Sequence, residues 1–402
     1  MTGEISNEKL WNQKFIFSSL ANFFAFTAMY YIMSTLPLFT TEVLGGSKGD
    51  VGVLFGLFAF AGVIARPFAG YMLDVMGRKK IVWLSLLGLV IAMFLYNWAV
   101  SLLFLLILRI IHGICWGFST TSLATLATDA IPFKKRGEGI GYFGLSMSVA
   151  MLIGPSLGLA VLQAFDYSTM FYAGTSLAAV SLLCLIGVKH NETAVSEHQK
   201  PKGIIEKKVL SDAVILFFVA IVYSAILSFI VLFAKEINVE NSGLFFLANA
   251  ITVIISRPYA GRIMDKNGPV GIMCVGFLTL CATFICLFLA NGYFLFVSAA
   301  LLLGVGFGIT FSTSIALAIN KVDISRRGMV NGTMLTAFDL GFALGAALMG
   351  LVSTYTGLRL MYLINGILVI IPFVIFYMKY IIKAKPDTAG EKGYCLGGGE
   401  RE

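Results

Sequence analysis

The chain has 402 residues, of which 58% are hydrophobic and only 12% are charged. A soluble domain carries roughly twice that share of charge, so a soluble protein of this length with polar surfaces is excluded. The mean hydropathy of +0.89 instead requires lipid or neighbouring helices around most side chains.

Long apolar runs recur along the whole chain and predict an all-α membrane protein. Each run is long enough for a membrane-spanning helix, which needs about 20 apolar residues. The first run is too long for a signal peptide and has no small-residue cleavage site, so we expect it to be retained. Twelve transmembrane helices are predicted, at residues 15–38, 51–73, 81–100, 102–128, 139–163, 169–188, 211–234, 242–264, 270–290, 293–319, 328–352 and 358–380.

Basic residues are distributed unevenly between the two sides of the predicted helices. With the N-terminus in the cytoplasm, 23 of the 29 Lys and Arg residues fall in inner loops and tails, and three fall in outer loops. The other three, Arg66, Arg109 and Arg257, fall within spans. This positive-inside pattern indicates a multi-pass protein of the cell inner (plasma) membrane with both termini cytoplasmic. Topology and attraction to anionic lipids therefore explain the net charge of +8, and nucleic acid is not an expected partner.

An internal repeat at a fixed offset of 191 residues divides the chain into two similar halves. Residues 66–77 read RPFAGYMLDVMG, and residues 257–268 read RPYAGRIMDKNG. Two parallel halves of this kind are found in transporters that bind substrate between the halves. We predict an N-terminal six-helix bundle at 1–188, a cytoplasmic linker at 189–210, a C-terminal six-helix bundle at 211–380 and a cytoplasmic tail at 381–402.

The repeated motif GxxxDxxG falls on the predicted inner loop after the second span of each half. Its glycines allow a tight turn and close helix approach, and its aspartate can face a helix N-terminus, where the helix dipole favours negative charge. We interpret the motif as a conformational latch that pairs the halves when the inner face is closed. A loop turn with topology charges is the alternative. The latch residues are Gly70, Asp74, Gly77, Arg78, Lys79 and Asp265.

Three stretches resemble one transporter family. The run GYMLDVMGRK at 70–79 looks like the loop signature of the major facilitator superfamily. In the fourth span, Arg109 and Gly113 stand where the drug/proton antiporters of that superfamily carry their membrane arginine and glycine, although His112 stands where they usually have Gln. In the fifth span, GPSLG at 154–158 is similar to the antiporter motif GPxxGG, without its last glycine.

The resemblance covers roughly residues 10–380. It implies the major facilitator fold, with twelve transmembrane helices in two six-helix bundles around a central cavity, and export driven by proton entry. A looser similarity of the eleventh span and the residues after it to exporters of opine-type metallophores offers such a compound as an alternative substrate.

Ionisable residues inside the spans are the candidates for proton coupling, because a charge at a helix centre costs roughly 2.5–3.5 kcal/mol on insertion scales. Asp339 lies near the middle of the eleventh span, and we interpret it as the proton carrier; a structural hydrogen bond is the alternative. Arg109 would bias the charge of a nearby acid, hold an anionic group of the substrate, or tether the backbone. His112 lies one turn away on the same face and would join a proton relay or serve in packing.

Residues of the first and fifth spans are predicted to shape the cavity or bend a helix. A proline inside a helix removes a backbone donor and bends it, and small neighbours give a close contact face. Aromatic and amide side chains suit a cavity for amphipathic ligands, with ordinary packing as the alternative. The residues of this set are Gly154, Pro155, Gly158, Tyr30, Tyr31 and Asn22.

Arg66 and Arg257 lie one turn inside the predicted inner loops at equivalent positions of the repeat. We interpret both as structural residues. Each can snorkel to the membrane interface or hold an acid such as Asp74 or Asp129.

These features together predict a proton-coupled secondary transporter that exports a small amphipathic solute or drug by alternating access. The alternatives are a specific metabolite or metallophore exporter and an uptake or uniport carrier. The chain has no GxxxxGK[ST], HExxH or GxSxG motif, so we expect no enzymatic activity, cofactor or metal. The expected partners are the small-molecule substrate, protons and membrane lipids, and the expected assembly state is a monomer.

Overall fold

The computed structural model describes residues 9–46, 48–186, 203–239 and 243–382. Most of the predicted linker (189–202) and nearly all of the predicted tail (383–402) lie outside the described residues. The described part is helical and contains no β-strand. Its α-helices are α1 (Gln13–Leu38), α2 (Lys48–Met76), α3 (Arg78–Leu95), α4 (Leu102–Ala130), α5 (Arg136–Ala164), α6 (Tyr167–Leu183), α7 (Leu210–Glu236), α8 (Gly243–Asn267), α9 (Pro269–Leu289), α10 (Tyr293–Ile319), α11 (Arg327–Leu368) and α12 (Ile370–Tyr377).

Ten helical segments in these described ranges are long and apolar enough to cross a membrane. The sequence predicts twelve, and the difference arises at two places. Helix α6 has only 17 residues, and α11 runs on toward α12, so that Ile324–Ile382 forms one long segment. Within that segment Gly357 has a non-helical φ of 77° and ψ of 167°, between the two spans that the sequence predicts.

Local chemistry explains where several helices begin. The side chains of Asn12, Ser101 and Asp166 accept hydrogen bonds from backbone N–H groups in the first turns of α1, α4 and α6, which satisfies donors that a helix start leaves free. Gly77 and Gly268, equivalent in the repeat, have φ of 92° and 84°. This left-handed conformation favours glycine and turns α2 into α3 and α8 into α9.

The packing of the first six helices is repeated in the last six. Helix α2 packs on α4 as α8 packs on α10, and α1 packs on α5 as α7 packs on α11. Contacts between the two groups are also repeated, because α5 packs on α8 as α11 packs on α2. The repeat in the sequence is therefore also a repeat of helix packing.

The apolar core is divided between these two groups of helices. One large cluster fills the second group, where Phe233, Phe284 and Phe296 are fully buried. Two smaller clusters, around Tyr31 and around Leu86, fill the first group. Many large apolar side chains remain exposed on the outside, such as those of α9 and α10, as expected for a protein surrounded by lipid.

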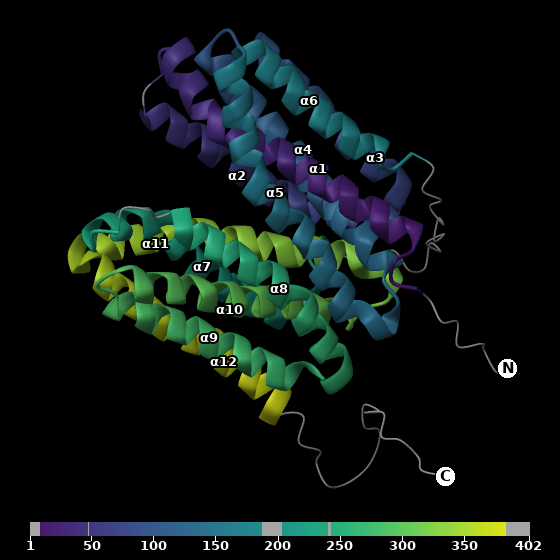
Figure 1. The fold of residues 1–402 in the computed structure, drawn as a ribbon. Coiled ribbons are helices and arrows are strands. Elements are labelled where there is room, and N and C mark those ends of the chain that lie inside the picture. The colour runs from purple at the N-terminus through teal and green to yellow at the C-terminus, as the bar shows by residue number, and fades with distance from the viewer. Residues whose placement is uncertain (1–8, 47, 187–202, 240–242, 383–402) are drawn as a thin grey trace, which may run out of the picture.

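The two groups of helices meet at one end and diverge toward the other (Figure 1). Hydrogen bonds between the groups join the C-terminal parts of α2 and α8 to the N-terminal parts of α11 and α5. We call this the closed end; it includes the turns at Gly77 and Gly268 and the connections 131–135 and 320–326. At the opposite, open end, side chains of α5, α8 and α11 such as Leu157, Leu247 and Leu348 are exposed.

Candidate functional site

At the closed end, Asp74 of α2 caps helix α11 across the interface between the halves. Its two carboxylate oxygens accept hydrogen bonds from the backbone N–H groups of Gly328 (3.1 Å) and Met329 (2.8 Å) in the first turn of α11. The side chain is fully buried, and the guanidinium of Arg78 lies 2.9 Å away. Helix N-termini favour anions, so this contact joins the two halves by complementary charge.

The second copy of the motif makes the equivalent contact in the opposite sense. Asp265 of α8 accepts hydrogen bonds from the N–H groups of Gly137 and Glu138, both at 2.9 Å, in the first turn of α5. Each donor and acceptor lies 191 residues from its counterpart in the first contact. Glu138 also binds Arg262 of α8 at 2.7 Å. The predicted approach of each aspartate to a helix N-terminus is therefore present, although the sequence did not specify which helix.

The structure corrects the predicted placement of the motif. Gly70 and Asp74 lie within the last two turns of α2 rather than on a loop, and Asp265 lies within α8. The helical position brings backbones together: a Cβ atom on Gly70 would lie 2.5 Å from the carbonyl oxygen of Gly328. Only a glycine permits this close crossing of α2 and α11.

Two arginines add further contacts between the halves at the closed end. Arg78 donates to the Asp129 carboxylate (2.9 Å) and to the backbone oxygen of Ile324 (2.5 Å), and Arg327 donates to the backbone oxygen of Thr128 (2.7 Å). These contacts connect α3 and α4 to the segment that leads into α11. The neighbouring latch candidate Lys79 is exposed and lies on the outer surface beside Trp83.

Asp339 forms an ion pair with Arg66, for which the sequence suggested an acid such as Asp74 or Asp129. Nε of Arg66 donates to Oδ2 of Asp339 at 2.6 Å, and Nη1 donates to Thr120 at 2.8 Å. The Arg66 side chain is 6% exposed, whereas that of Asp339 is 28% exposed. The pair joins α2 to α11, so the predicted proton carrier lies on the interface between the halves and is reachable by solvent.

Arg257 occupies the position equivalent to Arg66 but has no equivalent acid. The position equivalent to Asp339 is Ser148. Arg257 donates through Nη1 to the Gly144 carbonyl (2.5 Å), and its guanidinium lies over the ring of Phe311 (5.0 Å). Its Nε and Nη2 are buried without a hydrogen-bond partner among the described residues, a feature that the repeat alone did not reveal.

Arg109 and His112 form a second polar cluster inside the first half. Arg109 is fully buried, lies over the ring of Phe58 (4.2 Å) and donates to the Tyr96 hydroxyl (3.3 Å). That hydroxyl also bonds to Nδ1 of His112 (3.0 Å). Arg109 further approaches the Leu54 carbonyl of α2, about 18 Å along the helix from Arg66. The structure therefore brings Arg109 and His112 together but does not bring them to Asp339.

The candidates from the first and fifth spans meet where α1 packs on α5. Asn22 donates to Ser146 of α5 (2.7 Å), and Ser34 donates to the backbone oxygen of Pro155 (3.3 Å). Gly154 lies against Tyr30, and Gly158 lies against the carbonyl of Tyr31. These contacts pack two helices of the same half.

Metal ligands are not gathered anywhere in the described ranges. No group of three or more His, Cys, Asp or Glu side chains is suitably placed there. The described cysteines, Cys115, Cys184, Cys274, Cys281 and Cys286, are free thiols.

Comparison with known proteins identifies relatives that are named as exporters. The staphylopine export protein of Staphylococcus aureus is 26% identical over 362 residues, which cover 86% of this chain and 90% of the relative. The multi-drug resistance efflux pump PmrA homolog of Lactococcus lactis is 28% identical over 286 residues, which cover 66% of this chain and 70% of the relative. Both relatives agree with the predicted transport function.

A solved structure shows the fold, and a family model shows the family. The crystal structure of the human organic anion transporter MFSD10 matches with a TM-score of 0.78 at 15% identity, over 90% of this chain and 98% of that one. The model of the Major Facilitator Superfamily matches residues 18–270 and 213–394. Members of this family are transporters rather than enzymes, as predicted. The repeated helix packing and the family match together show that this chain belongs to the major facilitator superfamily.

Proposed function

We propose that the protein is a proton-coupled exporter of a small amphipathic solute, working by alternating access between two six-helix bundles. The bundles would comprise residues 1–188 and 211–380, joined by the linker 189–210. Two observations support twelve crossings. Helix α6 has 17 residues, which lies at the short end of the range for a membrane span. The break at Gly357 divides the long final segment in two.

The closed end is proposed to face the cytoplasm. The connections at this end carry most of the 29 Lys and Arg residues, including Arg78, Lys134 and Arg327. Loops rich in Lys and Arg stay on the cytoplasmic side during insertion. With this orientation the structure represents an outward-facing conformation, and the latch residues Gly70, Asp74, Gly77, Arg78, Lys79 and Asp265 act where the cytoplasmic entrance is shut.

One observation carries the coupling proposal: the ion pair between Arg66 and Asp339 joins the halves and involves a partly exposed acid. A proton arriving from outside neutralises Asp339 and removes its attraction to Arg66. The closed end then opens, because one of the charged links that hold α2 to α11 is lost. Deprotonation toward the cytoplasm and substrate binding restore the outward-facing state.

The energy available is sufficient for export. One proton that moves down 100 mV supplies about 2.3 kcal/mol, enough for roughly fifty-fold accumulation before any pH gradient is added. Proton and substrate need only favour different conformations of the two bundles.

The cluster of Arg109, Tyr96 and His112 is proposed to assist this cycle from inside the first bundle. Arg109 holds a positive charge that cannot be lost, and Nε2 of His112 is buried without a partner among the described residues. Asn22, Tyr30, Tyr31, Gly154, Pro155 and Gly158 are proposed to shape the wall of the path, since α5 packs on α8 of the second half and α1 packs on α5.

The test is substrate-triggered proton flux in proteoliposomes, with a panel of cationic drugs and metallophores. We expect Asp339→Asn to abolish uphill export and proton flux, because an amide keeps the shape but carries no exchangeable charge. The control is Glu236→Gln, which neutralises an exposed acid at the open end and should keep both activities. Full uphill export by Asp339→Asn would disprove the coupling assignment.

A metallophore is the second candidate substrate. The relative with 26% identity is named as a staphylopine export protein, and the unpartnered Nε and Nη2 of Arg257 suit a ligand with carboxylate groups. Export of a metallophore that is lost in Arg257→Gln, with drug export unaffected, would favour this substrate. Counterflow in vesicles separates both candidates from an uptake or uniport carrier.

A further inference from the structure

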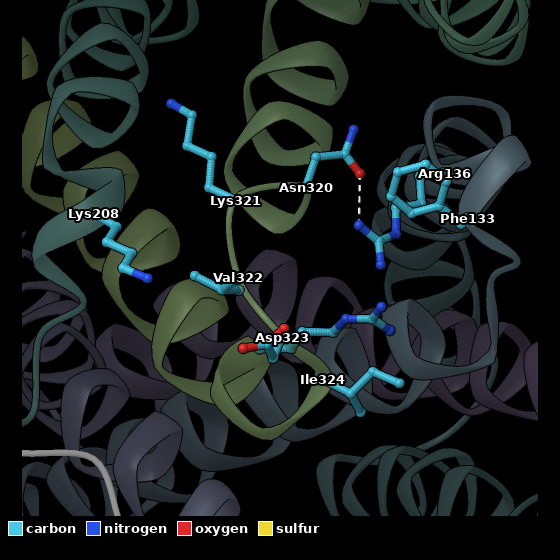
Figure 2. Close-up of a pocket in the computed structure, with 9 residues that line it drawn as sticks. Phe133, Arg136, Lys208, Asn320, Lys321, Val322, Asp323 and Ile324 are labelled. Carbon is cyan, nitrogen blue, oxygen red and sulfur yellow. Dashed lines mark hydrogen bonds between the residues drawn. The ribbon is translucent and has the colours of Figure 1, made fainter. Parts of the chain in front are cut away.

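A cavity of about 450 Å³ opens at the closed end, where the two halves meet (Figure 2). The first half contributes Phe133 and Arg136. The opposite wall consists of Lys208, just before α7, the connection from α10 to α11, and the first residue of α11. We call it the cationic pocket, lined by Phe133, Arg136, Lys208, Asn320, Lys321, Val322, Asp323, Ile324 and Arg327.

Positive charge dominates the lining. Arg136, Lys208, Lys321 and Arg327 line the pocket together with a single acid, Asp323, whose side chain is exposed. Lys321 also forms an ion pair with Asp212, which in turn binds Lys379 and the Tyr380 hydroxyl. Burial lowers the pKa of Lys321 to about 8, although the Asp212 carboxylate opposes the shift.

Both arginines of the pocket have N–H groups that make no described hydrogen bond. Arg136 is 7% exposed and makes its described hydrogen bonds through Nη1 alone, to Asn320 (2.7 Å) and to the Ile319 carbonyl (3.5 Å). Arg327 is 3% exposed and also uses only Nη1 in the described contacts. Nε of each is buried without a partner there. Buried charged donors without acceptors are unfavourable, so the site is incomplete without an added acceptor.

Phosphate oxyanions match this arrangement. A tetrahedral phosphate presents several oxygen acceptors, and the fork of an arginine binds two of them at once. The exposed ammonium of Lys208 adds a flexible charge at the rim. The volume lies within the range of small-ligand sites, and the flat ring of Phe133, 4.7 Å from the Arg136 guanidinium, holds that side chain in place.

We propose that the cationic pocket binds a phosphate-class oxyanion and thereby holds the closed end shut. Because the two halves supply opposite walls, opening the closed end separates the donors and destroys the site. A ligand that binds only one conformation shifts the population toward it. The phosphate belongs either to an anionic phospholipid headgroup or to a soluble phosphate compound. This inference does not depend on which residue carries the coupled proton.

Two experimental arms distinguish the sources. In the first, the full chain in detergent is titrated with inorganic phosphate at pH 7 by calorimetry, against chloride at matched ionic strength. In the second, thermal unfolding is compared in nanodiscs of phosphatidylcholine with and without phosphatidylglycerol. We expect saturable binding or stabilisation in at least one arm.

Single substitutions test whether the phosphate binds in the cationic pocket. Lys208→Gln should weaken binding roughly tenfold, and Arg136→Gln roughly 10- to 100-fold. Lys208→Gln leaves every described hydrogen bond of the protein in place, whereas Arg136→Gln also removes the bond to Asn320. Lys266→Gln is the matched control, because Lys266 is an exposed lysine of the closed end outside the pocket.

Each outcome has a definite meaning. An effect of phosphate alone assigns a soluble oxyanion, and an effect of phosphatidylglycerol alone assigns a lipid headgroup, provided that Lys208→Gln weakens it. Absence of both effects overturns the proposal. Equal losses in Lys208→Gln and Lys266→Gln also overturn it, because the attraction would then belong to the general charge of this face.

Discussion

Asp339 and Ser148 stand at equivalent positions of the two halves, yet only Asp339 carries a charge. The repeat therefore supplies an arginine on each side of the interface but an acid on one side alone. Arg66 has a carboxylate partner at 2.6 Å, whereas Arg257 has a carbonyl partner and two nitrogens without a partner in the described part of the chain. The asymmetry leaves this pair of equivalent positions with one charged link between the halves.

An acid at position 148 as well should stabilise the closed contact between the two halves. Ser148→Asp would offer a carboxylate to Arg257, and a hydrogen bond to a charged group contributes about 1.5–3 kcal/mol. We expect Ser148→Asp to unfold at a higher temperature than the neutral control Ser148→Asn and to transport several-fold more slowly, because the closed end opens less often. Calorimetry and counterflow measure the two effects. Equal unfolding temperatures for both variants would contradict the expected pairing.

Variants of Arg109 can distinguish a role in coupling from a role as a structural tether. If its charge serves coupling, Arg109→Gln should lose substrate-triggered proton flux while remaining folded, and Arg109→Lys should retain part of that flux. If it is a tether, both variants should lose stability, because a lysine cannot reproduce the contacts with Tyr96, Leu54 and Phe58. Proton flux and thermal unfolding on the same preparations decide between the roles.

At the scale of elements, the crossing of α2 and α11 depends on glycine. A Cβ atom on Gly70 would lie 2.5 Å from the Gly328 oxygen, while a Cβ atom on Gly56 in the same helix would meet nothing within 4 Å. The crossing lies between the halves and not inside either core. A larger residue there should therefore change conformation more than folding.

Gly70→Ala should consequently favour the inward-facing state. Overpacking costs about 1–3 kcal/mol, which corresponds to a shift of roughly 5- to 150-fold in the equilibrium between conformations. Gly56→Ala is the control for the change in helix propensity. Spin-label distances across the closed end should lengthen in Gly70→Ala and stay unchanged in Gly56→Ala. Unchanged distances in both would show that the crossing tolerates the methyl group.

At the scale of the whole molecule, much of the architecture is predictable from the sequence. The sequence indicates that Asp74 and Asp265 can each face a helix N-terminus, and the structure has hydrogen bonds from the N–H groups of Gly328 and Gly137 to these aspartates. The partner of Arg66 could not be predicted, because Asp339 lies 273 residues away and no local pattern links α2 to α11. The single long segment at the C-terminus also differs from the prediction, since Gly357 alone interrupts it.

The conformation of the whole molecule should respond to pH. Neutralising Asp339 removes the charged link to Arg66, so acid should shift the population toward an open cytoplasmic end. Spin labels at Lys80→Cys and Lys266→Cys, both exposed at the closed end in opposite halves, would report longer distances at pH 5 than at pH 8. The native cysteines are replaced beforehand so that only these sites carry labels.

Other acids also join the halves at this end, so the variant decides the assignment. Asp74 and Asp265 accept hydrogen bonds across the halves, and their protonation would loosen the same end. In Asp339→Asn the link to Arg66 is already neutral, and the distances at pH 8 should resemble those of the parent at pH 5. If Asp339→Asn retains the full pH response, the latch aspartates and not Asp339 sense the proton, and coupling operates through the helix N-termini.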